Sequence, residues 1–437
     1  MKAPDWLRSL PSGWQAKRSD AVLEYKKEPA RIIEFASCDV FHYSIPAIQE
    51  TGDGIVQDGG EIDSDKTWLN GGELIVSKLN PRKGCVLLTR PQRLPIVCST
   101  EFVPLVPKAG FSARFAYYVY SSTPVRDLIS SVVESATRSH QRANPEDIAK
   151  IWIPVPPIGT QGAIADYLDQ ETARIDALVV AKERLLSILA EKRRALITRA
   201  VTRGLNPNAP LRDSGVLWLG EIPAHWELIA LRFLVDISSG ATPDTMRPDF
   251  WDGDIPWVSP KDMKRDEIAD AEDHITPLAM SESTLKLIPP GAVLIVVRGM
   301  ILAHSFPTAI TTKPVTINQD MKALRCRQPI CPLFLCNYFR GKEAQLVALG
   351  DASAHGTRKL ATEVLGRFEV CVPPLTEQQA IVAHIAAETA KIDALYSETE
   401  HTIALLKERR AALIAAAVTG QMDIGDPVAA RPSDGVY

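Results

Sequence analysis

Residues 153–204 read IPVPPIGTQGAIADYLDQETARIDALVVAKERLLSILAEKRRALITRAVTRG, and residues 370–421 read VCVPPLTEQQAIVAHIAAETAKIDALYSETEHTIALLKERRAALIAAAVTGQ. The two stretches align without a gap and share 23 identical residues over 52 positions, whereas composition alone would give about three. A repeat of this length decides the architecture before any single helix or strand does. We therefore interpret the chain as two copies of one structural plan.

Both repeats have the apolar spacing of long helices. Apolar residues recur three, four and seven positions apart, which is the pattern of a heptad seam. The predicted seam residues are Ile175, Leu178, Leu185, Leu189 and Leu196 in the first repeat and Ile392, Leu395, Leu406 and Leu413 in the second. Since mixed segments flank each helix, we expect the two helices to pair antiparallel with each other; core packing within a larger helical domain is the alternative. Gly204 and Gly420 are predicted to end the helices in the left-handed conformation.

A second, shorter match precedes each repeat. Trp6 and Trp14 correspond to Trp218 and Trp226, and we expect these tryptophans to pack against the helix ends rather than to stack on bases. The predicted organisation is an arm with a first variable block at 1–152, a helical repeat at 153–204, a linker at 205–216, a second arm and block at 217–369, a second helical repeat at 370–421 and a tail at 422–437.

The two variable blocks mix short β-rich runs with one helical patch each. The predicted strands lie at 73–79 and 85–89 in the first block and at 292–298 and 314–325 in the second, and the predicted helices lie at 113–136 and 333–349. The fold class that we predict is α+β, with two α+β domains separated by two long antiparallel coiled-coil helices and related by a pseudo-twofold.

Composition is typical of a folded protein. Of the 437 residues, 46% are hydrophobic, and 49 Lys and Arg against 53 Asp and Glu give a net charge of -4, which excludes bulk disorder. The longest apolar run, 411–418, is shorter than the ~20 residues of a membrane span, and no apolar signal segment follows Met1. We expect a cytoplasmic protein with reduced thiols, in which Cys326, Cys331 and Cys336 pack in a core rather than bind zinc.

Charge is polarised in the same way in both blocks. Residues 78–114 hold seven basic residues and one acid, and residues 286–327 hold six basic residues and one acid. Just upstream the sign reverses, with nine acids against two bases in 31–73 and twelve against four in 236–282. Such basic stretches can bind phosphates locally on a chain with little net charge. A solvated surface is the alternative for either stretch alone, and its recurrence favours nucleic acid.

The common catalytic motifs are missing from the sequence. It contains no phosphate-binding loop, dinucleotide-binding, metalloprotease or hydrolase motif. Asp249, Asp262 and Lys264 resemble the carboxylates and lysine with which many nucleases hold a metal ion and activate water. A stand-alone metal-dependent nuclease is therefore the alternative to a binding protein, although this spacing arises often in loops rich in Asp and Lys.

Several short stretches carry a family likeness. They are RDS at 212–214, WLGEIPAHW at 218–226, GATP at 240–243, GDIPWV at 253–258, SKLNPRKG at 77–84 and VPPLTEQ at 372–378. Together with the duplication, they make nearly the whole chain resemble the specificity subunit of type I restriction-modification systems. That family is similarly built from two target-recognition domains and two helical regions.

The resemblance implies a subunit that catalyses nothing itself and reads a bipartite DNA target through its two recognition domains. It implies as partners double-stranded DNA, two methyltransferase (modification) subunits and the restriction/translocase subunits, and no membrane. S-adenosylmethionine, ATP and Mg are expected on the partner subunits, with no cofactor and no metal on this chain. The likeness also places Asp262 in a structural stretch, which weakens the nuclease alternative.

The candidate DNA-binding residues combine phosphate-binding cations with side chains that read base edges. They are Lys78, Asn80, Arg82, Lys83, Arg138 and Arg142 in the first block and Arg298, Lys322, Arg358 and Lys359 in the second. The candidate residues for docking of partner subunits are Gln161, Ile164, Glu377, Gln378 and Ile381. No catalytic residue is predicted. Because the first junction has Thr160 where the second has Glu377, the two docking sites are expected to differ in strength if the acid matters.

Overall fold

The computed structural model describes residues 3–135, 141–352, 357–422 and 424. It divides into two compact units, one formed by Met1–Glu183 with His401–Tyr437 and the other by Arg184–Glu400. Each unit contains one variable block and a segment of each of the two long helices, α6 (Ile158–Arg203) and α12 (Leu375–Val418). The α+β fold class with two long helices is therefore confirmed.

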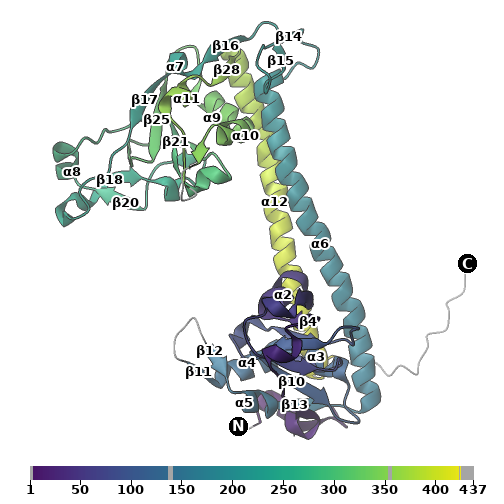
Figure 1. Ribbon diagram of the computed structural model, residues 1–437. Coiled ribbons are helices and arrows are strands. Elements are labelled where there is room, and N and C mark those ends of the chain that lie inside the picture. The colour runs from purple at the N-terminus through teal and green to yellow at the C-terminus, as the bar shows by residue number, and fades with distance from the viewer. Residues whose placement is uncertain (1–2, 136–140, 353–356, 423, 425–437) are drawn as a thin grey trace, which may run out of the picture. The chain divides into compact units, whose positions relative to one another are not determined.

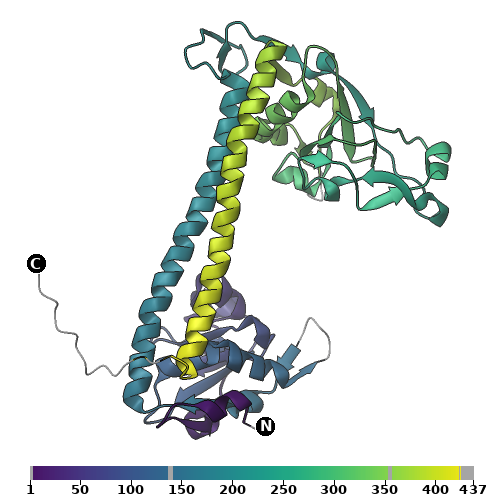
Figure 2. The ribbon, with the colours of Figure 1, turned by 180° about the vertical axis from the view of Figure 1, so that it is seen from behind.

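The long helices run antiparallel in both units. In the first unit, Arg410 Nε donates to Asp176 Oδ1 at 2.9 Å, and in the second unit Arg193 Nε donates to Asp393 Oδ1 at 3.2 Å. Figure 2 shows α6 and α12 side by side from the opposite direction to Figure 1. The predicted left-handed helix ends are also confirmed, since Gly204 has φ 70° and Gly420 has φ 72°, a conformation that glycine adopts without steric cost.

The buried seam between the two helices differs in part from the prediction, since in α6 it passes through Val179 and not through its neighbour Leu178. Ile175, Leu189 and Ile392 are buried as expected, but Leu178, Leu185 and Leu395 are exposed, so their assignment to the seam was wrong. The buried positions follow an alternating spacing of three and four through Val179 in α6 and through Thr399 and Ile403 in α12. Two parallel stripes of apolar residues run along α6, and spacing alone does not distinguish the stripe that faces a partner helix.

The first block contains two sheets with helices packed beside them (Figure 1). The four-stranded sheet has the order β2 (Leu23–Tyr25), β10 (Phe102–Pro107), β7 (Leu74–Ser77) and β8 (Val86–Leu88). The five-stranded sheet has the order β3 (Glu28–Ala30), β6 (Lys66–Leu69), β9 (Ile96–Ser99), β4 (Asp39–Tyr43) and β5 (Ile55–Asp58). Two further pairs are β1 (Gln15–Arg18) with β13 (Trp152–Val155) and β11 (Val133–Ser135) with β12 (Gln141–Ala143). The helices are α1 (Ile32–Phe35), α2 (Ile45–Thr51), α3 (Ala113–Ser121), α4 (Thr123–Ser131) and α5 (Pro145–Ala149).

The second block is organised around a five-stranded sheet of order β17 (Val235–Ser239), β25 (Met321–Cys326), β21 (Val293–Val296), β23 (Thr308–Thr311) and β19 (Glu267–Ile268). Two three-stranded sheets have the orders β20 (Asp273–Ile275), β18 (Trp251–Val258), β24 (Thr316–Ile317) and β22 (Arg298–Gly299), β27 (Arg358–Lys359), β26 (Asp351–Ala352). The pairs are β14 (Leu211–Asp213) with β15 (Glu221–Pro223) and β16 (Glu227–Ala230) with β28 (Glu369–Val372). The helices are α7 (Leu231–Leu234), α8 (Pro277–Glu282), α9 (Pro332–Gly341), α10 (Glu343–Ala348) and α11 (Thr362–Gly366).

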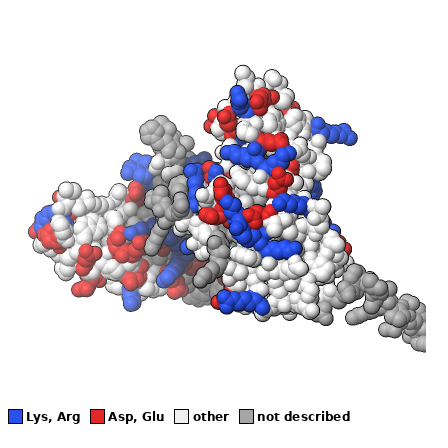
Figure 3. Space-filling model, turned by 90° about the horizontal axis from the view of Figure 1, so that it is seen from below, with Lys and Arg blue, Asp and Glu red and all other residues white. Residues whose placement is uncertain are grey.

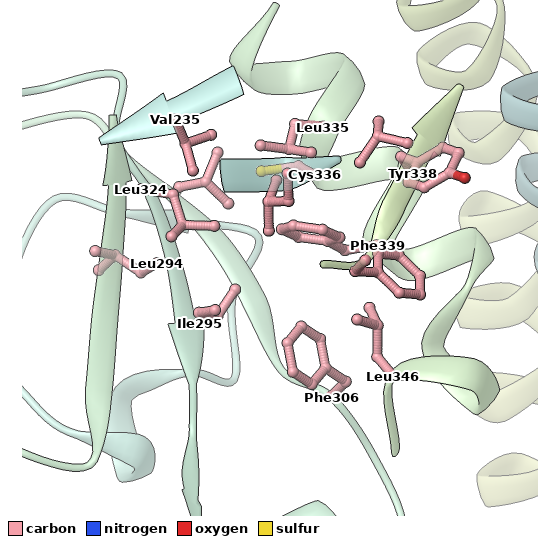
Figure 4. Close-up of a cluster of buried hydrophobic side chains, with 14 of the residues drawn as sticks. Val235, Leu294, Ile295, Phe306, Leu324, Leu335, Cys336, Tyr338, Phe339 and Leu346 are labelled. Carbon is pink, nitrogen blue, oxygen red and sulfur yellow. The ribbon is translucent and has the colours of Figure 1, made fainter. Parts of the chain in front are cut away.

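The core of the second block forms where α9 packs on the five-stranded sheet. Figure 4 shows Ile295 and Leu324 of the strands pointing toward Cys336 and Phe339 of α9. All four side chains are buried, and burial of apolar area of this kind is the main stabilising contribution to the block.

The predicted strands and helices of the blocks are largely present. Strands β7, β8 and β21 lie inside the predicted ranges 73–79, 85–89 and 292–298. The single helix predicted at 113–136 was wrong in two respects: extended backbone at Ser122 (ψ 145°), the N-cap of α4, separates α3 from α4, and the chain becomes strand β11 at Val133. Residues 333–349 are likewise two helices, α9 and α10.

Trp14 and Trp226 lie beside the glycines at the helix ends, which confirms the prediction for these two of the four arm tryptophans. In the second unit, Trp226 is buried in a cluster with Ile197 and Val201 of α6. In the first unit, Trp6 and Trp14 pack against a cluster that includes Ile414 and Val418 of α12. Trp218 instead stacks on Phe368, with ring centroids 5.0 Å apart.

Cys326, Cys331 and Cys336 behave as packing residues, as predicted. All seven cysteines are free thiols, and Cys336 is buried in the second core with Cys326 and Cys331 packed against it. Burial raises the pKa of Cys326 and of Cys336 to about 12, so both thiols stay protonated at neutral pH. In the part of the chain that the structure describes, no helix has both the length and the apolar character of a membrane span.

Candidate nucleic-acid interface

In the first unit, the candidate residues lie where the loop after β7 meets the β11–β12 hairpin. Backbone hydrogen bonds join the two segments: Asn80 N donates to Gln141 O at 2.8 Å, and Ala143 N donates to Lys78 O at 2.9 Å. Lys78, Asn80 and Arg142, which are far apart in the sequence, are therefore brought together. Arg138 lies outside the described residues.

A short turn at the end of this loop presents two cations. Asn80 has φ 48°, a left-handed conformation that asparagine tolerates better than most residues, and it leads into the 3-10 turn η4 (Pro81–Lys83). Lys83 N donates to Asn80 O at 2.9 Å, which closes the turn. Arg82 and Lys83 are both exposed, so the turn holds two positive charges on a backbone of fixed shape.

Glu101 holds the two segments of this surface in place through two hydrogen bonds. Its main-chain oxygen accepts a hydrogen bond from Lys78 N at 2.9 Å, and its Oε1 accepts one from Arg142 Nη2 at 2.8 Å. The Arg142 side chain remains 61% exposed, against 22% for Glu101. An ion pair as exposed as this one adds at most about 1 kcal/mol to stability. Its main effect is to fix the direction in which the Arg142 guanidinium points.

In the second unit, the candidate residues lie on the short strands β22 and β27. Arg298 pairs with Lys359 and Gly299 with Arg358 in antiparallel register, and Leu360 N donates to Val297 O at 2.8 Å. Arg298 and Lys359 are exposed. Arg358 is half-buried and donates from Nη1 to the Val347 carbonyl at 3.3 Å, so it also ties the strand to α10.

Lys322 borders the same surface from β25. Its Nζ donates to Ser239 Oγ at 2.7 Å. Partial burial lowers the pKa of Lys322, while the carboxylate of Glu363 raises it and the positive charge of Lys359 lowers it further.

The two basic surfaces are built on the same plan. Asp320 takes the place of Glu101: its main-chain oxygen accepts from Val297 N at 2.8 Å, and its Oδ1 lies 3.7 Å from Arg298 Nη1. Sequence reasoning did not single out either acid as a functional residue. The signal was present, however, since each is the sole acid of its basic stretch.

Two residues predicted to dock partner subunits are buried glutamines that fasten the long helices to their own blocks. Gln161 accepts from Ser112 N at 2.7 Å and donates to Pro156 O at 2.8 Å. Gln378 accepts from Cys331 N at 2.8 Å and donates to Pro373 O at 2.9 Å.

Ile164 and Ile381, also predicted to dock partner subunits, are buried as well. The assignment of Gln161, Ile164, Gln378 and Ile381 to a docking surface was therefore wrong, because these side chains are already enclosed by their own unit.

Glu377 alone of the predicted docking residues remains accessible. Its Oε2 lies 2.8 Å from His225 Nε2, with 26% of the Glu377 side chain and 50% of the His225 side chain exposed. The corresponding residues of the first half are Thr160 and Gly13, which cannot form such a pair. The two junctions therefore differ in charge as well as in sequence.

Asp249 and Asp262, the carboxylates of the nuclease alternative, accept hydrogen bonds from other groups of the second block. Asp249 Oδ1 accepts from Arg247 Nε at 3.1 Å, and the Arg247 guanidinium lowers the pKa of that carboxyl. Asp262 accepts from the backbone N–H of Ser259 and of Glu272, both at 2.8 Å. Among the described residues, no three His, Cys, Asp or Glu side chains are grouped so that they could hold a metal ion. Nothing in this arrangement supports the nuclease alternative.

Charge on the molecular surface is mixed rather than uniform. In Figure 3, Lys and Arg are interspersed with Asp and Glu over the visible face. Binding of an anionic polymer would therefore depend on the local clusters described above and not on the field of the whole protein.

A family model and two curated relatives match this chain. A model described as the type I restriction modification DNA specificity domain matches residues 11–183 and again residues 223–400. The specificity subunit of the Escherichia coli type I restriction enzyme EcoR124I/EcoR124II is 35% identical over 144 residues, which are 33% of this chain and 36% of that protein. The MjaIX specificity subunit of Methanocaldococcus jannaschii is 30% identical over 167 residues, which are 37% of this chain and 38% of that protein. The chain thus spans little more than a third of the length of these two relatives.

Two solved structures resemble the chain over nearly its full length. One is a chain solved in work on complex assembly and conformational transition of the type I R-M system; it has a TM-score of 0.77 and 20% identity and covers 95% of this chain and 100% of its own length. The other is the HsdS subunit from Thermoanaerobacter tengcongensis, with a TM-score of 0.53, 20% identity and coverage of 94% and 98%. At this level of identity, the likeness concerns the fold.

Proposed function

Because this chain belongs to the family of type I restriction-modification DNA specificity subunits, with two recognition domains, we propose that it reads a bipartite DNA target, one half-site with each variable block. The observation that carries this proposal is the recurrence of one basic surface at the same place in both blocks. Each surface joins a strand end, a hairpin strand and an acid that lies beside an arginine, which is on the hairpin strand in the first block (Arg142) and on the strand end in the second (Arg298).

The geometry suits major-groove reading. A bidentate arginine distinguishes guanine from other bases, and flanking cations hold the phosphates. Arg142 and Arg298 are the proposed base readers, because each is exposed and lies beside an acid, which is hydrogen-bonded to Arg142 and 3.7 Å from Arg298. Arg82, Lys83 and Lys359, which are exposed, are the proposed phosphate contacts.

The long helices are proposed to fix the distance between half-sites. The 46 residues of α6 correspond to about 69 Å of helix at 1.5 Å per residue. Half-sites on one face of a duplex recur about every 34 Å, so a continuous helix of this length is long enough to relate two of them.

Partner subunits are proposed to supply the chemistry. Two methyltransferase subunits would dock on the exposed faces of α6 and α12, and restriction subunits would join them, with S-adenosylmethionine, ATP and Mg bound by those partners. The Glu377–His225 pair is the proposed docking feature of the second junction. Because Thr160 and Gly13 replace it in the first, we expect the two methyltransferase sites to differ in strength. The proposed setting is the cytoplasm, where such a complex meets DNA.

The experiment that tests this function combines methylome sequencing with direct binding. We expect that deleting the gene removes methylation from one bipartite adenine motif and that the reconstituted complex binds the same motif, whereas the isolated chain with Mg²⁺ leaves DNA uncut. A complex that binds all sequences equally at every salt concentration would contradict the proposal, because sequence-independent binding is an electrostatic effect alone.

A further inference from the structure

Two exposed apolar side chains lie beside the basic strands of the second block. The turn η7 (Met300–Ala303) follows β22 directly, and 71% of Met300 and 40% of Ile301 are exposed. A single exposed apolar residue needs no explanation. Here, two adjacent residues continue the surface of Arg298, whose side chain is itself half exposed.

The corresponding turn of the first block has the opposite chemistry. Turn η4 also follows the strand end that pairs with the hairpin, and it is also entered through a residue with positive φ, Asn80 in place of Gly299. Where η4 presents Arg82 and Lys83, η7 presents Met300 and Ile301. The order of strand end, turn and hairpin pairing is therefore shared, while the side chains offered to a ligand change from two cations to two apolar groups.

A pair of apolar side chains with cations beside it is complementary to one feature of the DNA major groove, the methyl group of thymine. Thymine carries the only methyl group that the four bases present in the major groove, and phosphates flank it on both sides. Met is unbranched and adaptable, so it can follow a methyl group closely. Arg298 and Lys359 would hold the neighbouring phosphates or base edges while the apolar pair contacts the methyl.

We propose that Met300 and Ile301 form a thymine-specific contact, so that the second half-site contains an A·T pair read through its 5-methyl group. This inference rests on the proposed DNA-reading function and adds the chemical identity of one base. It also predicts that the two turns have different roles, because η4 holds phosphates in the first half-site and η7 contacts a base in the second.

The test replaces single thymines of the second half-site by deoxyuridine, which removes only the methyl group. With the reconstituted complex, we expect one such replacement to weaken binding about fourfold, the equivalent of one buried methyl. The Met300→Ala variant should bind thymine and deoxyuridine DNA equally. Comparison of the two affinity ratios, for the wild type and for the variant, then measures the coupling between Met300 and the thymine methyl group. Leu287→Ala, which truncates another exposed apolar residue of the second unit, should leave the fourfold discrimination intact.

The outcomes that would contradict the thymine contact differ from those that would contradict the proposed function. Equal binding of every deoxyuridine duplex by the wild-type complex, or a second half-site made only of G·C pairs, would overturn the thymine contact. A Met300→Ala variant that keeps the discrimination but loses methyltransferase binding would assign the apolar pair to a protein partner instead. A complex that shows no sequence preference at all would instead contradict the proposed function, so the two failures can be told apart.

Discussion

Arg142 and Glu101, 41 positions apart in the sequence, are joined by a hydrogen bond of 2.8 Å between Nη2 and Oε1. The same acid accepts the backbone N–H of Lys78, so one residue orients both the arginine and the loop beside it. In the second unit, Asp320 lies 3.7 Å from Arg298, without a side-chain hydrogen bond, and accepts the backbone N–H of Val297. An arginine held as Arg142 is held loses less conformational freedom when it meets a base edge.

Replacement of Glu101 by Gln is expected to weaken binding to the target without weakening non-specific binding. The amide can still accept one hydrogen bond, but the charge that directs Arg142 is lost. We expect affinity for the target to fall about tenfold, which is ~1.4 kcal/mol, while non-specific binding stays the same or tightens slightly. Competition titrations with target and random DNA measure both quantities. An equal loss for both DNAs would show that Glu101 does not act through base reading.

Removal of the two cations of η4 is expected to change the salt dependence of binding. If Arg82 and Lys83 each neutralise one phosphate, the slope of log K against log salt should fall by about 1.8 in the double alanine variant. Affinity should fall for every sequence alike. Binding measured at several salt concentrations provides the slope. An unchanged slope would place these two residues away from the DNA backbone.

The buried glutamine at the start of α12 is expected to stabilise the second unit. Gln378→Ala would leave the Cys331 N–H and the Pro373 and Pro329 carbonyls without their partner. An unpaired buried group costs about 1–3 kcal/mol. Because the bonds to Cys331 and Pro329 are only part-buried, water can replace part of their loss, and we expect a total of about 2–4 kcal/mol. Denaturant unfolding followed by tryptophan fluorescence measures it. The neighbouring and exposed Gln379 provides the control, since Gln379→Ala should leave stability nearly unchanged.

Lengthening both helices by one heptad is expected to shift the spacing of the target. The insertion sites are Glu183 in α6 and Lys407 in α12, which lie opposite each other at 3.4 Å in the first unit. Seven residues keep the phase of the seam and add about 10 Å of helix. At 3.4 Å per base pair, the preferred gap should grow by about three base pairs. An unchanged gap would mean that helix length does not set the distance between half-sites.

Part of the fold could be predicted from the sequence because residues 153–204 are repeated in residues 370–421. The repeat predicted two long helices and their antiparallel pairing, and the glycines at 204 and 420 marked where both helices end. The phase of the seam did not follow, because Leu178 and Val179 are neighbours and both are apolar. Only the geometry of the partner helix decides which of the two is buried.

The DNA-binding and docking residues were predicted less completely, because a local sequence pattern shows neither which distant segments pair nor which polar side chains are buried. Lys78 and Arg142 were identified by charge, and the structure brings them together through backbone pairing that no local pattern encodes. Gln161 and Gln378 were mistaken for surface residues, because a repeated polar residue in a helix start does not reveal whether its amide faces solvent or the backbone of its own block. Glu101 and Asp320 passed unnoticed because acids are not expected in a surface that binds an anion.

Selection of bound sequences from a pool of random DNA, with the wild-type complex and with the variants Arg142→Ala and Arg298→Ala, tests the central claim most directly. Two separate readers predict a motif of two half-sites with a fixed gap, in which Arg142→Ala relaxes one half only and Arg298→Ala relaxes the other half only. A single continuous motif, or the loss of the same half-site in both variants, would contradict the account.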